Sequence, residues 1–101
     1  MDFEISWTEP ARAALVAAVR HVADSDPEGA EQLGRDLLAS VDILARFPFI
    51  GPVHERRRAG EIREILCRRY RIFYQPYEDD RRVEVLLVWH ASRREPRLPR
   101  R

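Results

Sequence analysis

The sequence contains no lysine, and all 18 of its basic residues are arginine. Arginine can grip a phosphate or a carboxylate with two parallel N–H groups, but it stays protonated and cannot act as a general base. Any proton transfer by this chain would therefore fall to a histidine, a carboxylate or a tyrosine. A GC-rich coding bias would produce the same arginine-only composition, so the composition alone does not assign a function.

Cysteine and long apolar runs are scarce too. The single cysteine, Cys67, excludes an internal disulfide and a cysteine-built zinc site, and its apolar strand pattern predicts a small core residue. No apolar stretch approaches the roughly 20 residues that a membrane span needs. The chain begins with the acidic Asp2 and Glu4 instead of a basic-then-apolar signal pattern. We therefore expect a cytoplasmic protein with no membrane partner.

The charge is unevenly distributed along a chain that is long enough for one domain, which we expect to span residues 1–101. Residues 1–50 hold 4 arginines and 9 acidic residues, a net charge of −5. Residues 51–101 hold 14 arginines and 8 acidic residues, a net charge of +6. A basic half on a nearly neutral chain points to an anionic partner, either a nucleic acid or an acidic protein.

The N-terminal half predicts one strand and two helices. Apolar and polar residues alternate over 2–7, which is typical of a half-buried strand. A helix follows over about 9–24 with Thr8 as its cap, and a second helix begins after Asp26 and runs to about residue 46. Their apolar stripes predict an antiparallel helical hairpin that covers a core.

The C-terminal half predicts a meander of strands. Two prolines and a glycine in FPFIGPV end the second helix, and residues 54–60 are expected to form a polar loop. Strand patterns follow at 61–67, 68–77 and 81–89. The order of elements predicts an α+β fold in which the helices pack on one face of a four-stranded antiparallel sheet.

The tail ASRREPRLPRR contains two prolines and five arginines. A long helix is therefore not expected there. From about residue 95 onward the tail is a candidate disordered segment.

The stretch RRYRIFYQ places three arginines among aromatic and β-branched residues. In a strand, its Arg71 points away from the side that carries Ile72. If the helices cover the Ile72 side, Arg71 lies on the open face of the sheet. Two interpretations stay open: Arg71 contacts an anionic ligand, or it pairs with a carboxylate of a neighbouring strand such as Glu64 or Glu84.

Further arginines are candidates for contact with a nucleic acid or another anionic partner. Arg56, Arg57 and Arg58 form a patch in the expected loop, and Arg63 could extend it into a basic groove. A solvated charged surface is the alternative for this patch. Arg93, directly after the last strand, is a further candidate.

His90 is the histidine of most interest because it ends the last strand, near the expected position of Arg71. A histidine there could titrate near neutral pH, although a strand-end histidine bonded to the backbone is the alternative. The helical hairpin separates His21 from the other two histidines, so no metal site is expected. No motif for a cofactor is present, and none is expected.

Taken in order, ISWTEPA, a helical hairpin ending in LARFPFIG, then IREI, YRIFY and VLLVWHASR resemble the RelE/ParE superfamily of bacterial type II toxins. The resemblance covers nearly the whole chain, and the fold of that superfamily is the one predicted above. It implies a toxin, of the plasmid-stabilisation type, that a co-expressed antitoxin neutralises by laying an extended or helical segment over it. A homodimer, or a heterotetramer with the antitoxin, is the assembly that it suggests.

The resemblance also frames the choice of target. RelE-like members cleave messenger RNA in the ribosomal A site with basic residues around the scissile phosphate, whereas ParE-like members lack that set and poison DNA gyrase. Arg71 matches a phosphate-contacting arginine of the RelE-like enzymes, and Arg93 matches a second basic position. The chain has no lysine pair before YRIFY and no tyrosine beyond Arg93. The resemblance therefore favours a ParE-like gyrase inhibitor.

Two alternatives remain. The first is a RelE-like, ribosome-dependent endoribonuclease in which Arg71 and Arg93 hold the phosphate and His90 assists proton transfer. The second is a degenerate member of the superfamily that binds a protein partner and is no longer toxic.

Overall fold

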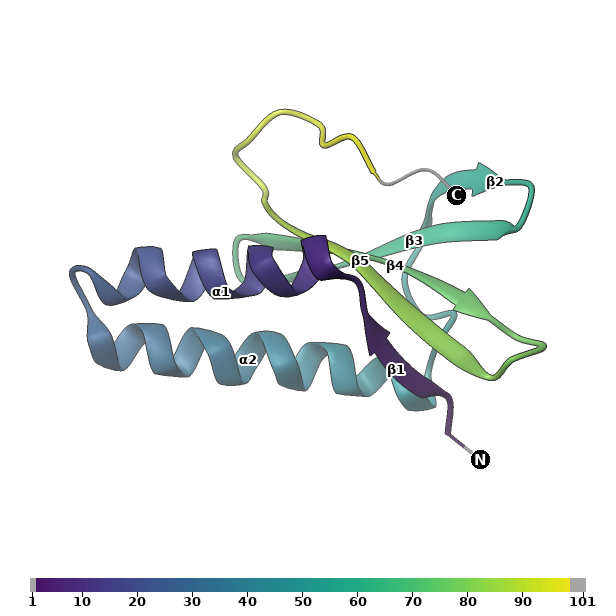
Figure 1. The fold of residues 1–101 in the computed structure, drawn as a ribbon, viewed down its shortest axis with the longest axis horizontal. Coiled ribbons are helices and arrows are strands. Elements are labelled where there is room, and N and C mark those ends of the chain that lie inside the picture. The colour runs from purple at the N-terminus through teal and green to yellow at the C-terminus, as the bar shows by residue number, and fades with distance from the viewer. Residues whose placement is uncertain (1, 99–101) are drawn as a thin grey trace.

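The computed structural model describes residues 2–98, and its chain forms two long helices and a twisted sheet (Figure 1). In chain order the elements are β1 (Glu4–Trp7), α1 (Glu9–Ala23), α2 (Pro27–Arg46), β2 (Val53–Arg57), β3 (Gly60–Cys67), β4 (Tyr70–Tyr77) and β5 (Arg82–His90). The helices lie antiparallel against one face of the sheet (Figure 1), which confirms the predicted α+β fold and helical hairpin. Among residues 2–98, no helix is long and apolar enough to cross a membrane.

The sheet differs from the prediction in two respects. Within residues 2–98 it has five strands, not four, in the order β1-β5-β4-β3-β2, and β1 runs parallel to β5 while the other pairs are antiparallel. The added strand is β2, which lies, except for Val53, in the segment 54–60 predicted as a polar loop. Its sequence VHERR has no apolar alternation, and its backbone pairing with β3 does not require one. An alternating pattern carries no information about strand direction either, so the sequence of β1 could not show that it is parallel.

Both helices start where the sequence predicts. Thr8 caps α1: its Oγ1 accepts a hydrogen bond from the Ala11 N–H at 3.2 Å. The same hydroxyl lies 3.1 Å from the carbonyl oxygens of Val85 and Leu86, so it also fastens the start of the helix to β5. Asp26 caps α2 through a 3.0 Å bond from the Gly29 N–H to its Oδ1.

The main core lies between the helices and the sheet. Apolar side chains of α2 meet those of β4 and β5 there, each almost wholly removed from water. Burial of one such aliphatic side chain stabilises the fold by about 1.5–3 kcal/mol. The prediction that Cys67 is a core residue is confirmed. The buried members of this cluster are Ala11, Leu33, Leu37, Val41, Cys67, Ile72, Val85 and Val88.

The opposite face of the sheet carries a second, smaller apolar cluster, formed by Ile62, Phe73 and Leu86. Leu87, Trp89 and Leu98 pack against it. Leu86 and Leu87 both reach this cluster because the β4–β5 register shifts after Phe73, which leaves Leu86 without a directly paired residue. Leu98 comes from the tail, so part of the chain's own C-terminal segment covers this face.

The loop between α2 and β2 is fastened to the sheet at Gly51. Its N–H donates to the hydroxyl of the buried Tyr74 at 2.9 Å, and its carbonyl accepts a bond from Arg63 at 2.8 Å. A Cβ at this position would lie 2.4 Å from the Glu64 carbonyl oxygen, which is part of the backbone and cannot swing away. The position therefore requires glycine.

We expect Gly51→Ala to lower the free energy of unfolding by about 1–3 kcal/mol because it overpacks the loop against β3. Gly34→Ala is the matched control, since its added Cβ would make an ordinary 3.5 Å contact with Val19 in the helical hairpin. That variant should be more stable than the wild type by about 0.5–1 kcal/mol. Urea unfolding followed by circular dichroism measures both. A Gly51→Ala variant as stable as the wild type would contradict this account of the loop.

Candidate functional site

Arg71 lies on the face of the sheet opposite the helices, where two carboxylates hold it. Its Nε and one terminal nitrogen donate to the two oxygens of Glu64 on the neighbouring strand, at 2.8 and 3.1 Å. Its other terminal nitrogen donates to Oε1 of Glu95, in the tail, at 2.7 Å. The Arg71 side chain is only 16% exposed. Of the two interpretations left open, the structure shows the ion pair with Glu64.

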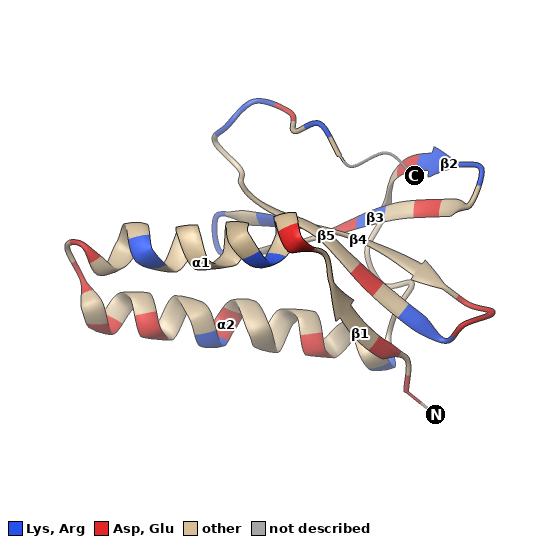
Figure 2. Ribbon diagram, viewed as in Figure 1, with Lys and Arg blue, Asp and Glu red and all other residues tan. Residues whose placement is uncertain are grey.

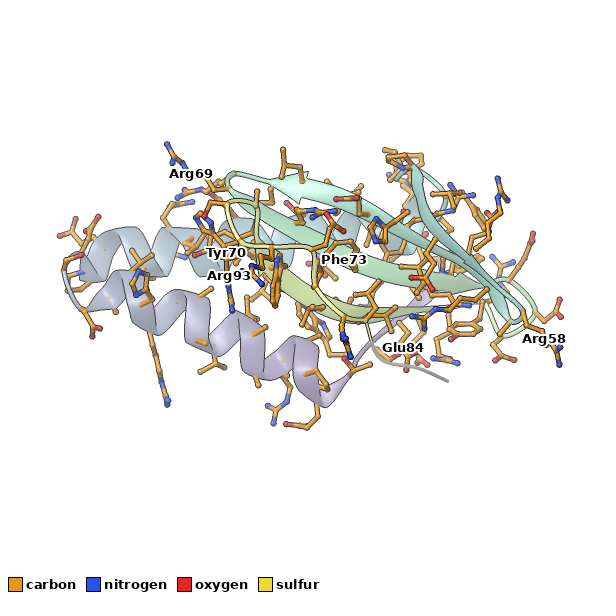
Figure 3. All side chains as sticks on the ribbon, turned by 90° about the horizontal axis from the view of Figure 1, so that it is seen from above. Arg58, Arg69, Tyr70, Phe73, Glu84 and Arg93 are labelled. Carbon is orange, nitrogen blue, oxygen red and sulfur yellow. The ribbon has the colours of Figure 1, made fainter. Side chains whose placement is uncertain are left out.

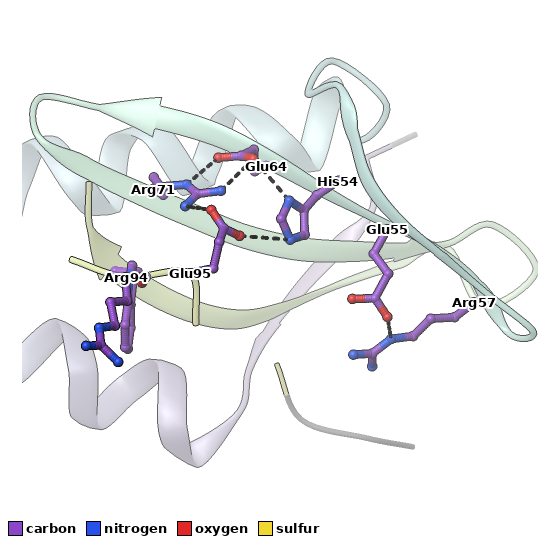
Figure 4. A network of polar contacts seen from close by, with 8 residues as sticks. His54, Glu55, Arg57, Glu64, Arg71, Arg94 and Glu95 are labelled. Carbon is purple, nitrogen blue, oxygen red and sulfur yellow. Dashed lines mark hydrogen bonds and ion pairs between the residues drawn. The ribbon is translucent and has the colours of Figure 1, made fainter. Parts of the chain in front are cut away.

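His54 on β2 completes the group. Its Nδ1 lies 3.4 Å from Glu64 and its Nε2 lies 3.8 Å from Glu95. The Arg71 guanidinium lies over the Phe73 ring and the imidazole meets that ring edge to face, each at 4.8 Å from the ring centroid. We call His54, Glu64, Arg71 and Glu95 the Arg71 cluster; Figure 4 shows how they converge from β2, β3, β4 and the tail.

The charges of the cluster are strongly coupled. The hydrogen bond from Arg71 lowers the pKa of Glu64, and the positive charge of Arg71 adds to that effect against the opposing effect of burial. Hydrogen bonds to Glu64 and Glu95 raise the pKa of Arg71. At neutral pH Glu64 is therefore ionised and Arg71 is charged. All three guanidinium nitrogens of Arg71 already donate to carboxylates, so a new anion would meet a guanidinium that is already paired with two negative charges.

The structure does not bring Arg71 and His90 together, so the expectation that they are neighbours is wrong. Trp89 pairs with Arg71 across β4 and β5, whereas His90 pairs with Tyr70 and packs against its ring at 5.1 Å. Consecutive strand residues point to opposite faces, so His90 shares the face of Tyr70. The histidine beside Arg71 is instead His54.

His90 lies next to a cavity of about 490 Å³ between α1 and β5. Its Nδ1 is 2.6 Å from the Ser92 hydroxyl and accepts a bond from the Ser92 N–H at 3.2 Å. His21 and Arg93 line the same cavity. Arg93 also lies over the Trp89 ring, 4.1 Å from its centroid. Of the three residues proposed for RNA cleavage, His90 and Arg93 are therefore close to each other and Arg71 stands apart.

The other predicted arginines differ in how freely they can meet a partner. Arg63 is 17% exposed and binds the carbonyls of Phe49 and Gly51, so it holds the loop before β2. Its Nε is buried and has no hydrogen-bond partner within the described residues 2–98. The guanidinium of Arg63 thus has a structural role, and its contact with an anion stays a prediction.

Arg56, Arg57 and Arg58 lie at the end of β2 and in the turn that follows. Arg56 pairs with Glu61, and Arg57 donates to Glu55 at 2.7 Å. Arg58 is exposed at the tip of the β2–β3 hairpin, far from Arg69 at the other end of the sheet (Figure 3). Figure 2 shows this arginine-rich tip apart from the acidic turn between β4 and β5.

Two members of the cluster had no distinctive signal in the sequence. The sequence predicts a loop around His54, because β2 has no strand pattern. Glu95 lies between an arginine and a proline in the tail, far along the chain from its partners. Only the return of the tail over the sheet brings Glu95 to Arg71. Among residues 2–98, no group of three or more histidine, cysteine or carboxylate side chains is arranged to hold a metal ion.

The lowered pKa of Glu64 predicts how stability depends on pH. Loss of the Glu64 charge should cost about 1–2 kcal/mol of stability at pH 7, because it leaves the Arg71 guanidinium without its main partner. The contribution of this charge is present above the ordinary glutamate pKa of 4.5 and is lost as the pH falls through the lower value of the folded state. Glu64→Gln should therefore be less stable than the wild type at pH 7, with the difference shrinking in acid.

Urea unfolding at a series of pH values measures the two free energies. Glu31→Gln is the control, because its carboxylate pairs with Arg35 on the exposed side of α2, where both side chains are 67% exposed. Its curve should follow that of the wild type. A Glu64→Gln deficit that stays constant down to pH 3 would show that the ion pair does not carry the effect.

Comparisons with known proteins agree with this architecture. Residues 5–95 match the family described as "ParE toxin of type II toxin-antitoxin system, parDE". Among curated proteins, none matches the sequence of the chain significantly.

Two solved structures share the fold. A chain of the chromosomal ParDE toxin–antitoxin system from P. aeruginosa superposes with a TM-score of 0.74 at 16% identity, over 89% of this chain and 97% of that one. A chain of the toxin–antitoxin complex RelBE2 from Mycobacterium tuberculosis gives a TM-score of 0.65 at 20% identity, over 89% of this chain and 99% of that one. At these identities the likeness concerns the fold, and the family match covers nearly the whole chain. The chain belongs to the ParE toxin family of type II toxin–antitoxin systems.

Proposed function

We propose that the protein is a ParE-like toxin that acts in the cytoplasm, inhibits DNA gyrase and is neutralised by a cognate antitoxin. The family match supports the toxin assignment. The choice of gyrase over messenger RNA rests on one observation: Arg71 is bound to carboxylates on one face of the sheet, while His90 lies on the other. Inhibition of an enzyme by binding requires no catalytic group on the toxin, so this separation does not stand against it.

RNA cleavage by attack of a 2′-hydroxyl would need a phosphate clamp, a base and an acid within hydrogen-bond reach of one phosphate. The arginine expected to clamp already donates from all three nitrogens to Glu64 and Glu95. The nearest imidazole, His54, lies between the same two carboxylates. Two carboxylates beside the clamp would repel a phosphate. The geometry therefore favours a binding surface over a nuclease centre.

The antitoxin is proposed to bind along α2 and the free edge of β3. Large apolar side chains are exposed on the second half of α2 and in the loop after it, which is unusual on a small monomer. β2 pairs with β3 from Gly60 to Arg63, and the Glu64 N–H donates to the Pro52 carbonyl, so the edge of β3 is proposed to accept an added strand beyond Glu64. A segment that is partly helix and partly strand would cover both features. The exposed apolar residues on this side are Leu38, Ile43, Phe47, Phe49 and Ile50.

Gyrase, or its complex with DNA, is proposed to meet the arginine-rich tip of the β2–β3 hairpin. Arg58 is exposed there and Arg56 is 76% exposed, so both can reach a partner without unfolding the domain. Neither belongs to the surface proposed for the antitoxin. An antitoxin that extends from the β3 edge towards this tip would block both at once.

We expect induced expression of the chain to cause gyrase-linked DNA breaks and an SOS response, and the purified protein to inhibit supercoiling by gyrase. Cleavage of messenger RNA on ribosomes with intact DNA would instead identify an endoribonuclease. Absence of toxicity combined with tight antitoxin binding would overturn the proposal in favour of a degenerate member.

Variants separate binding from catalysis. Arg58→Glu should weaken gyrase inhibition severalfold because it places a like charge against an anionic partner. Arg12→Glu on α1 is the matched control and should leave inhibition unchanged, since Arg12 is also exposed but belongs to a helix and not to the β2–β3 hairpin. His90→Ala should also inhibit gyrase like the wild type. Loss of all toxicity in His90→Ala, with a normal circular dichroism spectrum, would argue for catalysis instead.

A further inference from the structure

The tail returns over the sheet after β5 instead of leaving the domain. Residues 91–98 form no helix or strand, and they pass across β5 and β4 towards β2 (Figures 1 and 3). The Trp89 indole N–H donates to the Arg94 carbonyl at 2.6 Å, which turns the chain back. Glu95 then reaches Arg71 and His54, and Leu98 reaches the apolar cluster of Ile62, Phe73 and Leu86.

These contacts define two subsites on the face opposite the helices. The carboxylate subsite consists of the Arg71 terminal nitrogen that does not bind Glu64 and of the Nε2 of His54. These two atoms face the two carboxylate oxygens of Glu95. The apolar subsite is the Ile62–Phe73–Leu86 cluster, which takes Leu98. The two occupants are three residues apart, so an extended chain spans them over roughly 10 Å.

The tail is bound only weakly in its two subsites. The Glu95 side chain is 66% exposed, in contrast to the 16% exposed Arg71 that it meets. Arg71 keeps its two-pronged bond to Glu64 without any help from the tail. Removal of Glu95 would therefore leave a preformed guanidinium with one terminal nitrogen free.

We propose that this face is a receptor for an extended segment of a partner protein that carries an acidic residue and, three positions later, an aliphatic one. The chain's own Glu95–Leu98 segment occupies the receptor as an intramolecular competitor. A partner segment must displace it to bind. The inference rests on the proposed function, because it takes the Arg71 face of the sheet as a surface that binds a partner. It deepens that function by naming the chemistry of the bound segment.

The chemistry of the two subsites fits a peptide and not a nucleic acid. Glu64 stays bonded to Arg71 and has a lowered pKa, so its negative charge offsets the positive charge of Arg71 in the cluster without Glu95. A single carboxylate replaces Glu95 without adding charge, whereas a run of phosphates would bring repulsion from Glu64. The apolar subsite gains from an aliphatic side chain, which a phosphate backbone does not have.

Substitutions in the tail can weaken the competing Glu95–Leu98 segment without changing any residue of the receptor. Glu95→Gln combined with Leu98→Ala in the full chain removes both anchors of the tail but leaves every receptor residue in place. If the wild-type tail is seated about nine-tenths of the time, the double variant should bind a matching peptide about tenfold more tightly. Arg97→Ala is the control, because it changes an exposed tail residue that lies between the two anchors.

The probe is a fluorescein-labelled ASRREPRL peptide, the sequence of residues 91–98, and fluorescence anisotropy measures its binding. We expect the double variant to bind it about tenfold more tightly than the wild type or Arg97→Ala. The same peptide with glutamine in place of its glutamate should bind poorly. In NMR spectra of the wild type, the unlabelled peptide should shift the Trp89 indole resonance as the tail is displaced.

Equal binding by all three proteins, equal binding of the glutamate and glutamine peptides, or no binding at all would overturn the inference. Displacement of the peptide by a short single-stranded DNA at equal concentration would do the same, in favour of a nucleic-acid surface. Gyrase inhibition is scored separately. Peptide binding without gyrase inhibition would support the receptor and contradict gyrase as the target. Gyrase inhibition without peptide binding would contradict the receptor alone.

Discussion

The central strand β4 is buried on both of its faces, and this constraint governs the rest of the structure. All residues from Ile72 to Pro76 are buried, although the helices cover only one side of the sheet. The helical side is filled by long apolar stripes of α1 and α2. No helix within residues 2–98 covers the other side, so Phe73 and its neighbours need a different cover there. The small apolar cluster, the Arg71 cluster and the returning tail together provide that cover.

The Arg71–Glu64 ion pair in this cover fixes the orientation of its charged groups. It contributes little to the net free energy of unfolding. Pairing Arg71 with Glu64 costs desolvation of both charges, which their attraction and hydrogen bonds roughly offset. The benefit is geometric, because a two-pronged bond across β3 and β4 fixes the direction of the guanidinium. Its remaining terminal nitrogen then points to the surface, where the tail or a partner can meet it. In this arrangement Arg71 can bind an anion, and any proton transfer falls to other groups.

The alternation of apolar and polar residues was sufficient to predict most of the fold. Helix starts followed from Thr8 and Asp26, since their side chains cap the backbone locally and need no tertiary partner. The same reasoning missed β2, because an edge strand is made by backbone pairing and its side chains need not alternate. For the site, strand periodicity placed Arg71 on the face away from the helices and suggested Glu64 as its partner. It misplaced His90, whose face depends on the β4–β5 register.

The sequence by itself determined the class of fold, the helical hairpin, the side of β4 that faces the helices and membership of a toxin superfamily. These follow from local capping, from periodicity and from motifs in a fixed order along the chain. Only the tertiary structure decided which groups surround Arg71. His54 and Glu95 lie 17 residues before it and 24 residues after it, and neither carries a local signal. Their meeting depends on strand register, on the Trp89–Arg94 turn and on Leu98 finding an apolar surface, all of which are long-range packing effects.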